Sequence, residues 1–169
     1  KVNLGKGFSI IRAIKKTTGN LILVTDADLS APISEFNKLL KKINEGYDFV
    51  IGSRNKKESL VTLKQGIIRI IFGKCFNIII KIILGLKFND TQCGFKLFDA
   101  KKLKKISSKC YVSRFCIDVE ILYLSKLLNI NVYEQGIIWN NNKDSSVRII
   151  RDSINMFFDI FKIRFRKYK

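Results

Sequence analysis

The sequence has no histidine, a single proline and few acidic residues. Without histidine, mechanisms that use an imidazole base and metal sites that use an imidazole ligand are excluded. With one proline and no low-complexity stretch, the chain does not resemble a disordered protein. The cysteines show no C-x-x-C spacing, so we expect no cysteine metal site, and such scattered thiols fit a reducing compartment. These are Cys75, Cys93, Cys110 and Cys116.

The charge is strongly one-sided, with 32 Lys and Arg against 14 Asp and Glu and a formal net charge of +18. Such a balance favours an anionic partner, which could be nucleic acid, an anionic membrane surface or a phosphorylated substrate. Charge alone does not choose between these partners. The chain has 169 residues, 47% of them hydrophobic, so we expect one domain over residues 1–169 with its own core.

Helical and strand-like segments alternate along the chain. Short apolar runs at residues 21–25 and 48–52 are typical of strands buried on both faces. Helical spacing precedes the first run over 6–18 and separates the two runs over 33–44. This alternation predicts an α/β fold with parallel strands. Two further elements are expected, a helix over 117–128 and a strand over 132–139.

Two segments have the pattern of amphipathic helices. Residues 65–86 are rich in Ile, but Arg69, Lys74 and Lys81 interrupt the run and share one side with Asn77. This pattern predicts a helix that lies in a membrane interface rather than one that crosses the bilayer. Residues 148–169 place their charges opposite a row of Ile and Phe. That segment is either a surface helix packed on the core or a second interfacial helix.

Asp26 and Asp28 directly follow the first buried strand. They therefore lie where open α/β sheets bind ligands, beyond the carboxyl ends of the strands. Two carboxylates at this spacing can hold a divalent cation that bridges to a diphosphate, an arrangement that Mg²⁺ favours. The alternative is that the pattern arises by chance and Asp28 only caps the next helix.

Basic residues and glycines occur at related positions. Arg54 follows the second buried strand, so we expect its guanidinium on the same rim of the sheet, in position to bind a phosphate. Gly5, Lys6 and Gly7 begin the first helix, where backbone N–H groups and a lysine can contact a phosphate. Each of these patterns is weak when taken alone.

Together these residues form a recognisable series. In chain order it reads N-L-G-K-G (3–7), T-D-A-D-L-S (25–30), G-S-R (52–54), D-T-Q-C-G-F-K (90–96), I-D-V-E-I-L (117–122) and Trp139. The series resembles glycosyltransferase family 2, in particular the dolichyl-phosphate β-glucosyltransferases and their bacterial polyprenyl-phosphate relatives. The resemblance extends over nearly the whole chain, and D-T-Q-C-G-F-K is its most specific element.

The resemblance implies a GT-A-like, Rossmann-like fold and a role for each matching position. Asp26 and Asp28 match the residues that bind Mg²⁺ or Mn²⁺. The implied substrate-binding residues are Gly5, Lys6, Gly7, Arg54, Arg69, Gln92 and Lys96, and the implied catalytic residues are Asp90, Asp118 and Glu120. Gly94 belongs to the same loop as Asp90. Residues i and i+2 of a helix point about 200° apart, so Asp118 and Glu120 are not expected to face one site together.

Family members begin with a strand and a V-I-P-x-Y-N-E-like segment, followed by an acidic residue that recognises the base. This sequence has neither, so we expect the N-terminal nucleotide-binding strands to lie upstream of Lys1.

The resemblance implies an inverting, metal-dependent transfer of a hexose, glucose from UDP-glucose, to a polyprenyl or dolichyl phosphate. The acceptor phosphate has a second pKa of about 6, so it is ionised at neutral pH and needs no strong base. The expected location is the cytoplasmic face of a membrane, either the bacterial inner membrane or the endoplasmic reticulum. The alternatives are a non-catalytic membrane-docking fragment and a basic nucleic-acid-binding module. Nucleic acid is not the expected partner, because the C-terminal Phe and Tyr residues segregate from the Lys and Arg residues.

Overall fold

The computed structural model describes residues 4–62, 66–140 and 149–168, with the backbone alone for residues 68, 69 and 149–151. Its centre is a four-stranded sheet in the order β1-β4-β2-β5. Strand β4 runs antiparallel to both of its neighbours, whereas β2 and β5 are parallel. The strands are β1 (Leu21–Thr25), β2 (Phe49–Ser53), β4 (Phe95–Asp99) and β5 (Val132–Gly136).

The sheet is mixed because it contains an antiparallel strand, β4, that was not expected. The expected strands β1 and β2 do run in the same direction, but β4 lies between them, with Leu97 opposite both Leu23 and Val50. This strand was not predicted from the sequence, because Phe95 and Lys96 end the D-T-Q-C-G-F-K motif, which was interpreted as a loop. The expected strand over 132–139 is also divided, and its end forms β6 (Ile138–Trp139), which pairs with β3 (Leu60–Val61).

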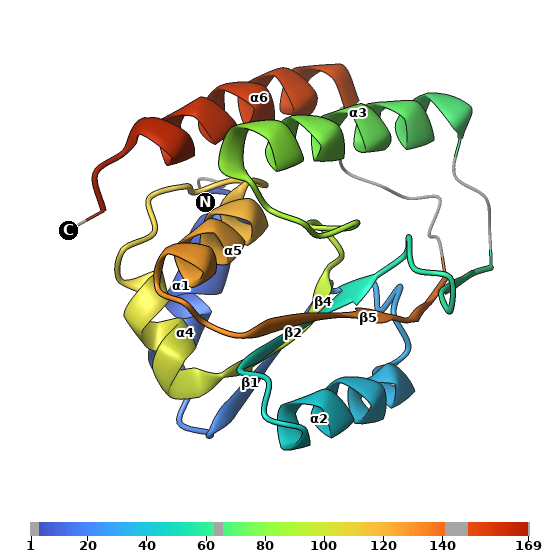
Figure 1. The fold of residues 1–169 in the computed structure, drawn as a ribbon, viewed down its shortest axis with the longest axis vertical. Helices are drawn as coiled ribbons and strands as arrows, with labels where there is room; N and C mark the ends of the chain where they lie inside the picture. The colour runs from blue at the N-terminus through green and yellow to red at the C-terminus, as the bar shows by residue number, and fades with distance from the viewer. Residues whose placement is uncertain (1–3, 63–65, 141–148, 169) are drawn as a thin grey trace.

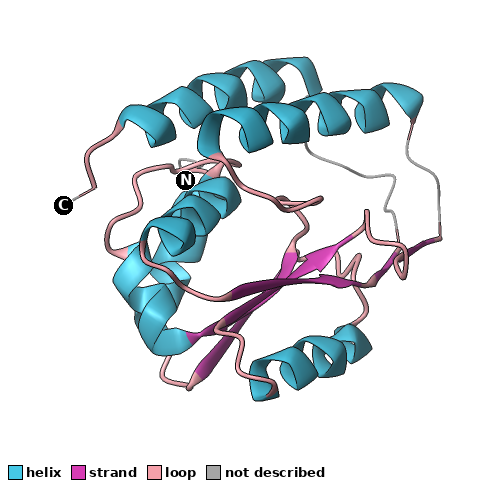
Figure 2. Ribbon diagram, in the orientation of Figure 1, coloured by secondary structure: helices cyan, strands magenta, loops and turns pink. Residues whose placement is uncertain are grey.

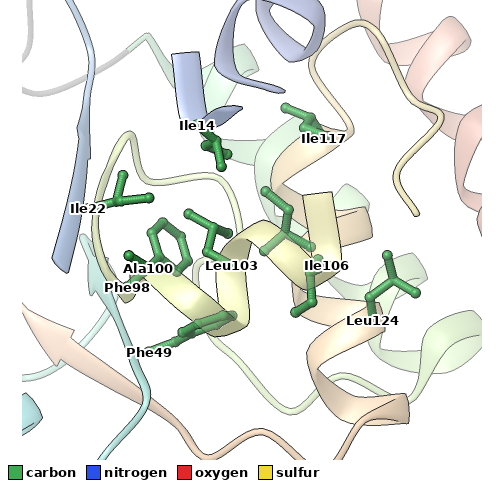
Figure 3. Packing of buried hydrophobic residues seen from close by; sticks show 10 residues of the cluster. Ile14, Ile22, Phe49, Phe98, Ala100, Leu103, Ile106, Ile117 and Leu124 are labelled. Atoms are coloured by element: carbon green, nitrogen blue, oxygen red, sulfur yellow. The ribbon is translucent and has the colours of Figure 1, made fainter. Parts of the chain in front are cut away.

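Helices cover both faces of the sheet (Figure 1). Helices α1 (Lys6–Lys16), α4 (Ala100–Ser107) and α5 (Ile117–Leu127) lie on one face. Helix α2 (Phe36–Asn44), preceded by the 3₁₀ turn Ile33–Glu35, covers the other face. Figure 3 shows the core between the sheet and the first group of helices. Its buried members include Ile14, Ile22, Phe49, Phe98, Leu103, Ile106, Ile117 and Leu124.

The alternation of side chains along β4 explains how a lysine comes to be buried. Phe95 and Leu97 face the α2 side, and Phe98 faces the opposite side, where its ring packs edge-on against Phe49 at 4.8 Å. Lys96 shares the side of Phe98, because successive residues of a strand point to opposite faces. Its side chain is only 2% exposed. A buried ammonium needs a charged partner, and α5 supplies one.

The two long helices α3 (Ile67–Leu84) and α6 (Ile149–Phe165) lie side by side across the end of α5 (Figures 1 and 2). They share a buried cluster in which Ile80, Ile160 and Ile163 pack with Val119 of α5. Within the described residues, we find no helix with the length and apolar character needed to cross a bilayer.

Helix α3 is amphipathic, as expected, with polar side chains toward the protein and apolar side chains in solvent. Asn77 and Lys81 were expected on the polar side of the helix, and both side chains turn inward and donate to Asn89. The outward surface instead presents isoleucines, among them Ile78 at 55% and Ile82 at 77% exposure. The sequence pattern predicted the amphipathic helix, but it did not indicate that the polar side would hold the loop after α3.

Helix α6 shows the same exposure of apolar groups. Its core contacts come from Met156, Ile160 and Ile163. The row of aromatic residues remains largely in solvent, with Phe158 57% and Phe165 77% exposed. The segment therefore does pack on the core, as one of the two interpretations expected, but not through its aromatic row.

Candidate active site

One rim of the sheet gathers most of the residues singled out in the sequence. Strands β1, β2 and β5 all end there, and β4 begins there, because Thr25 pairs with Phe95 and Ser53 with Gly136. The rim therefore brings together Asp26, Arg54 and the loop over 90–94. This is the edge at which open α/β sheets bind ligands.

Arg54 and Asp90 form a bidentate ion pair. Arg54 Nε donates to Asp90 Oδ2 at 2.7 Å, and Nη2 donates to Oδ1 at 2.9 Å. The backbone N–H groups of Arg54 and Gln92 also donate to this carboxylate, at 3.0 and 3.3 Å. Burial opposes ionisation, but the Arg54 charge and its hydrogen bonds hold the pKa of Asp90 below its ordinary value. Asp90 is 4% exposed and behaves as a fixed anion.

This geometry favours a positioning role for Asp90 over proton removal. Four donors already occupy its oxygens, so the carboxylate serves to aim the guanidinium. Arg54 also lies over the Trp139 ring, at 5.1 Å from its centroid. The loop itself is held by Glu134, whose carboxylate accepts from the backbone N–H groups of Asn89 and Asp90. Glu134 and Asn89 escaped the sequence analysis because neither belongs to a recognisable pattern.

Asp26 and Asp28 differ in their surroundings. Asp26 Oδ1 accepts from Lys6 Nζ at 3.0 Å. Asp26 Oδ2 lies against Gly94, where an added Cβ would come within 1.8 Å, so only glycine fits beside this carboxylate. Asp28 is exposed, and its Oδ1 accepts from the backbone N–H of Ser30 at 3.0 Å. This hydrogen bond closes a local turn over residues 28–30. Asp28 therefore does not cap the following helix, which was the alternative considered.

The two carboxylates fit a divalent cation that takes its remaining ligands from a substrate. Within the described ranges there is no group of three or more His, Cys, Asp or Glu side chains that could hold a metal. Within these ranges the protein alone therefore does not supply a complete set of metal ligands. Exposed Asp28, with Asp26 two residues before it, matches the sites in which Mg²⁺ is bound by one or two carboxylates together with substrate phosphates.

Behind the acidic pair lies a buried network of alternating charges. Asp118, in the first turn of α5, accepts from Lys96 Nζ at 2.7 Å and pairs with Lys6 Nζ at 3.5 Å. Burial opposes the charge of Asp118, but Lys96 and then Lys6 keep the pKa of Asp118 below its ordinary value. Lys96 thus lies beneath the rim, and Asp118 connects it through Lys6 to Asp26.

Glu120 does not join this network. Its carboxylate accepts from the backbone N–H groups of Tyr111 and Val112 and from the hydroxyl of Tyr168, at 2.8–3.1 Å. Burial raises the pKa of Glu120. The expected acidic pair of α5 is therefore divided, as its i, i+2 spacing indicated. Asp118 pairs with Lys6 and Lys96 behind the rim, whereas Glu120 holds the loop before α5.

The glycines around Lys6 have a structural explanation. An added Cβ would lie 2.4 Å from Ser113 O at Gly5 and 2.5 Å from Val112 O at Gly7. These glycines therefore allow the start of α1 to approach the loop over 112–114. Of the three residues expected to bind phosphate there, Lys6 is the one whose charge reaches the rim.

A groove of about 390 Å³ runs from the rim to the underside of α3. Arg54, Asp90 and Gln92 line it together with apolar side chains of α3 and β3. The other lining residues are Asn55, Val61, Ile70, Gly73, Lys74, Phe76, Asn77, Asn89 and Thr91. Arg69 lies in the first turn of α3, but its side chain is outside the described part of the chain.

Comparisons with known proteins agree with this architecture. The model of the family described as Glycosyl transferase family 2 matches residues 1–107. The dolichyl-phosphate beta-glucosyltransferase of Dictyostelium discoideum is 34% identical over 98% of this chain and 52% of its own length. The protein of the same name from Homo sapiens is 28% identical over 97% of this chain and 52% of its own length. The chain thus spans about half the length of the curated relatives it matches.

A solved structure confirms the expected fold class. Glucosyl-3-phosphoglycerate synthase from Mycobacterium tuberculosis, in complex with Mn²⁺ and uridine-diphosphate-glucose, matches with a TM-score of 0.66 at 15% identity. The match covers 95% of this chain and 55% of that one. The mixed α/β arrangement described above therefore belongs with the GT-A-like folds.

Proposed function

Because the chain belongs to glycosyltransferase family 2, we propose that its protein transfers a hexose from a nucleotide sugar to a polyprenyl or dolichyl phosphate. The observation that carries this proposal is the groove beneath α3. It joins a fixed guanidinium at the rim to an apolar surface, which suits an acceptor with a phosphate head and a hydrocarbon tail. Transfer of labelled glucose into lipid, as opposed to a soluble phosphate, tests the assignment.

We infer that the donor binds at the acidic end of the rim, with glucose from UDP-glucose as the proposed sugar. Asp28, supported by Asp26, would hold Mg²⁺ or Mn²⁺, which neutralises charge on a departing nucleoside diphosphate. The names of the relatives and the donor in the mycobacterial structure support this choice. Lys6, beside Asp26, adds positive charge on the side where the diphosphate would lie.

The chain's own residues would then position the acceptor. Nε and Nη2 of Arg54 are engaged by Asp90, so Nη1 is the nitrogen presented to a phosphate. In the proposed reaction an ionised oxygen of the acceptor phosphate attacks the anomeric carbon of the sugar. The bond to the nucleoside diphosphate breaks on the opposite side, which inverts the anomeric configuration. No proton leaves the acceptor in this step, which accords with an Asp90 whose oxygens are already occupied.

We also propose that the exposed apolar sides of α3 and α6 lie on an anionic membrane surface. The two helices are neighbours, and their outward isoleucines and phenylalanines lie beside cations such as Lys74 and Lys162. A surface of this composition suits the boundary between acyl chains and anionic headgroups. The groove opens beneath α3, so a lipid phosphate could reach Arg54 without leaving the membrane interface.

Replacing Ile78 and Ile82 together with Asp is expected to reduce binding to anionic vesicles by more than about tenfold, because each apolar side chain lost from the interface removes about 1.5–3 kcal/mol. Both side chains are exposed, so the fold should remain intact. The measurement is co-sedimentation with phosphatidylserine-containing vesicles. Ile33→Asp with Leu127→Asp, on exposed positions of other elements, is the control for added charge. Unchanged sedimentation of the Ile78 and Ile82 variant would show that this surface does not make the membrane contact.

A further inference from the structure

Lys6 occupies an unusual position between two carboxylates. Its Nζ lies 3.0 Å from Asp26 Oδ1 and 3.5 Å from Asp118 Oδ2. The Lys6 and Asp26 side chains are 27% and 35% exposed, whereas Asp118 is 6% and Lys96 2% exposed. The series therefore runs from a buried ammonium to a carboxylate that solvent reaches. Its four formal charges cancel without any bound ion.

The buried half of this series does not depend on Lys6 for its charge balance. Lys96 binds Asp118 directly and also donates to the Cys93 carbonyl. Burial alone would lower the pKa of Lys6, but Asp118 and then Asp26 raise it, so the Lys6 ammonium stays charged. Lys6 is thus a permanent cation that neutralises Asp26 from within the protein.

We propose that Lys6 is the resident counter-ion of Asp26 and competes with divalent cations for this carboxylate. The proposal rests on the proposed function, in which Asp28 and Asp26 hold the metal. An ammonium 3.0 Å from Asp26 Oδ1 both occupies a lone pair that a metal would use and repels a doubly charged ion. Metal binding to the free rim is therefore weak until something else attracts Lys6.

Competition by Lys6 would couple metal binding at the two carboxylates to the arrival of the donor. A diphosphate brings negative charges that can take Lys6 away from Asp26, while Asp118 keeps the ammonium close to the rim. Metal and donor would then favour each other's binding, which is a coupling between two ligands. Without a bound donor, a divalent ion would bind to the rim only weakly.

The test is the affinity of the full-length protein for Mn²⁺ alone, measured from the electron paramagnetic resonance signal of the unbound ion. Lys6→Met is expected to bind Mn²⁺ at least about tenfold more tightly than the unmodified chain, because the competing charge is gone. Lys6→Arg keeps the charge and should remain as weak as the unmodified chain. Lys15→Met, on the exposed surface of the same helix, makes the same change in net charge away from Asp26. Circular dichroism establishes that each variant is folded.

The outcomes separate this inference from the proposed function. If Lys6→Met binds Mn²⁺ no more tightly than Lys15→Met, Lys6 is not a competitor and the inference is overturned. Asp28→Asn, introduced into the Lys6→Met chain, should abolish the gain. If the gain survives that change, the ion is bound elsewhere, and the proposed metal site fails together with the inference. If Asp28→Asn weakens Mn²⁺ binding but Lys6→Met does not strengthen it, the metal site stands without the inference.

Discussion

Asp28→Asn is expected to lower sugar transfer by the full-length protein by at least about two orders of magnitude, equivalent to about 2.7 kcal/mol of transition-state stabilisation. A site that holds a cation through only one or two carboxylates loses most of its affinity for the metal when one of them becomes neutral. The turn should persist, since an Asn side-chain oxygen can accept from Ser30 N–H as Asp28 does. Thermal unfolding should therefore be nearly unchanged.

The measurement compares initial rates at saturating Mg²⁺ for the unmodified protein, Asp28→Asn and Asp159→Asn. Asp159 lies on α6, where its Oδ1 accepts from Lys162 Nζ at 3.2 Å, so its replacement controls for the loss of one negative charge outside the rim. A near-normal rate for Asp28→Asn would remove the metal assignment and the donor half of the proposed mechanism.

Asp90→Asn is expected to have the largest effect on stability. The change leaves the Arg54 guanidinium without its anion in a largely buried setting, and breaking a buried pair in this way costs about 3 kcal/mol or more. Chemical denaturation measures the difference. Because the pKa of Asp90 is lower in the folded than in the unfolded state, its contribution is full above the unfolded value of about 3.9. The contribution is lost as the pH falls through the folded pKa, so the two proteins should converge in strong acid.

The same pair supplies a test of how Asp90 acts. If Asp90 works by aiming Arg54, then Arg54→Gln, Asp90→Asn and the double variant should all lose transfer to a similar extent, because each change breaks one unit. Separate roles in the reaction would make the losses of the two single variants multiply in the double variant. That result would indicate that Asp90 contacts the substrate directly.

Strands β1, β2 and β5 and all the described α-helices except α4 were predictable because their signals are local. The run Leu21–Thr25 and the residues after it placed Asp26 and Asp28 at the rim, and Arg54 followed by the same argument. Strand β4 was not predictable in this way. Its five residues contain a lysine whose burial makes sense only with Asp118, which is 22 positions away.

The details of the site depended on contacts between distant segments. No local pattern indicates that Glu134 anchors the loop of Asp90 across 44 positions, or that Asn77 and Lys81 turn inward to meet Asn89. The helical spacing of Asp118 and Glu120 correctly predicted that they would diverge. It gave no indication of which one would face the rim, since that depends on where the loop over 111–114 lies.

The central claim is that the groove beneath α3 receives a lipid phosphate, and Gly73 offers a direct way to test it. Gly73 lines the groove and Gly66 does not, and a Cβ added at either position meets no atom within 4 Å. Gly73→Phe should therefore fill the groove without disturbing the packing, and Gly66→Phe is its matched control.

The decisive measurement is transfer of radiolabelled glucose from UDP-glucose by the full-length protein, offered dolichyl phosphate in detergent or 3-phosphoglycerate in water. We expect label in the organic phase, a loss of more than about tenfold with Gly73→Phe, and near-normal transfer with Gly66→Phe. Label on 3-phosphoglycerate with none in the lipid, or lipid transfer by Gly73→Phe at the unmodified rate, would contradict the account.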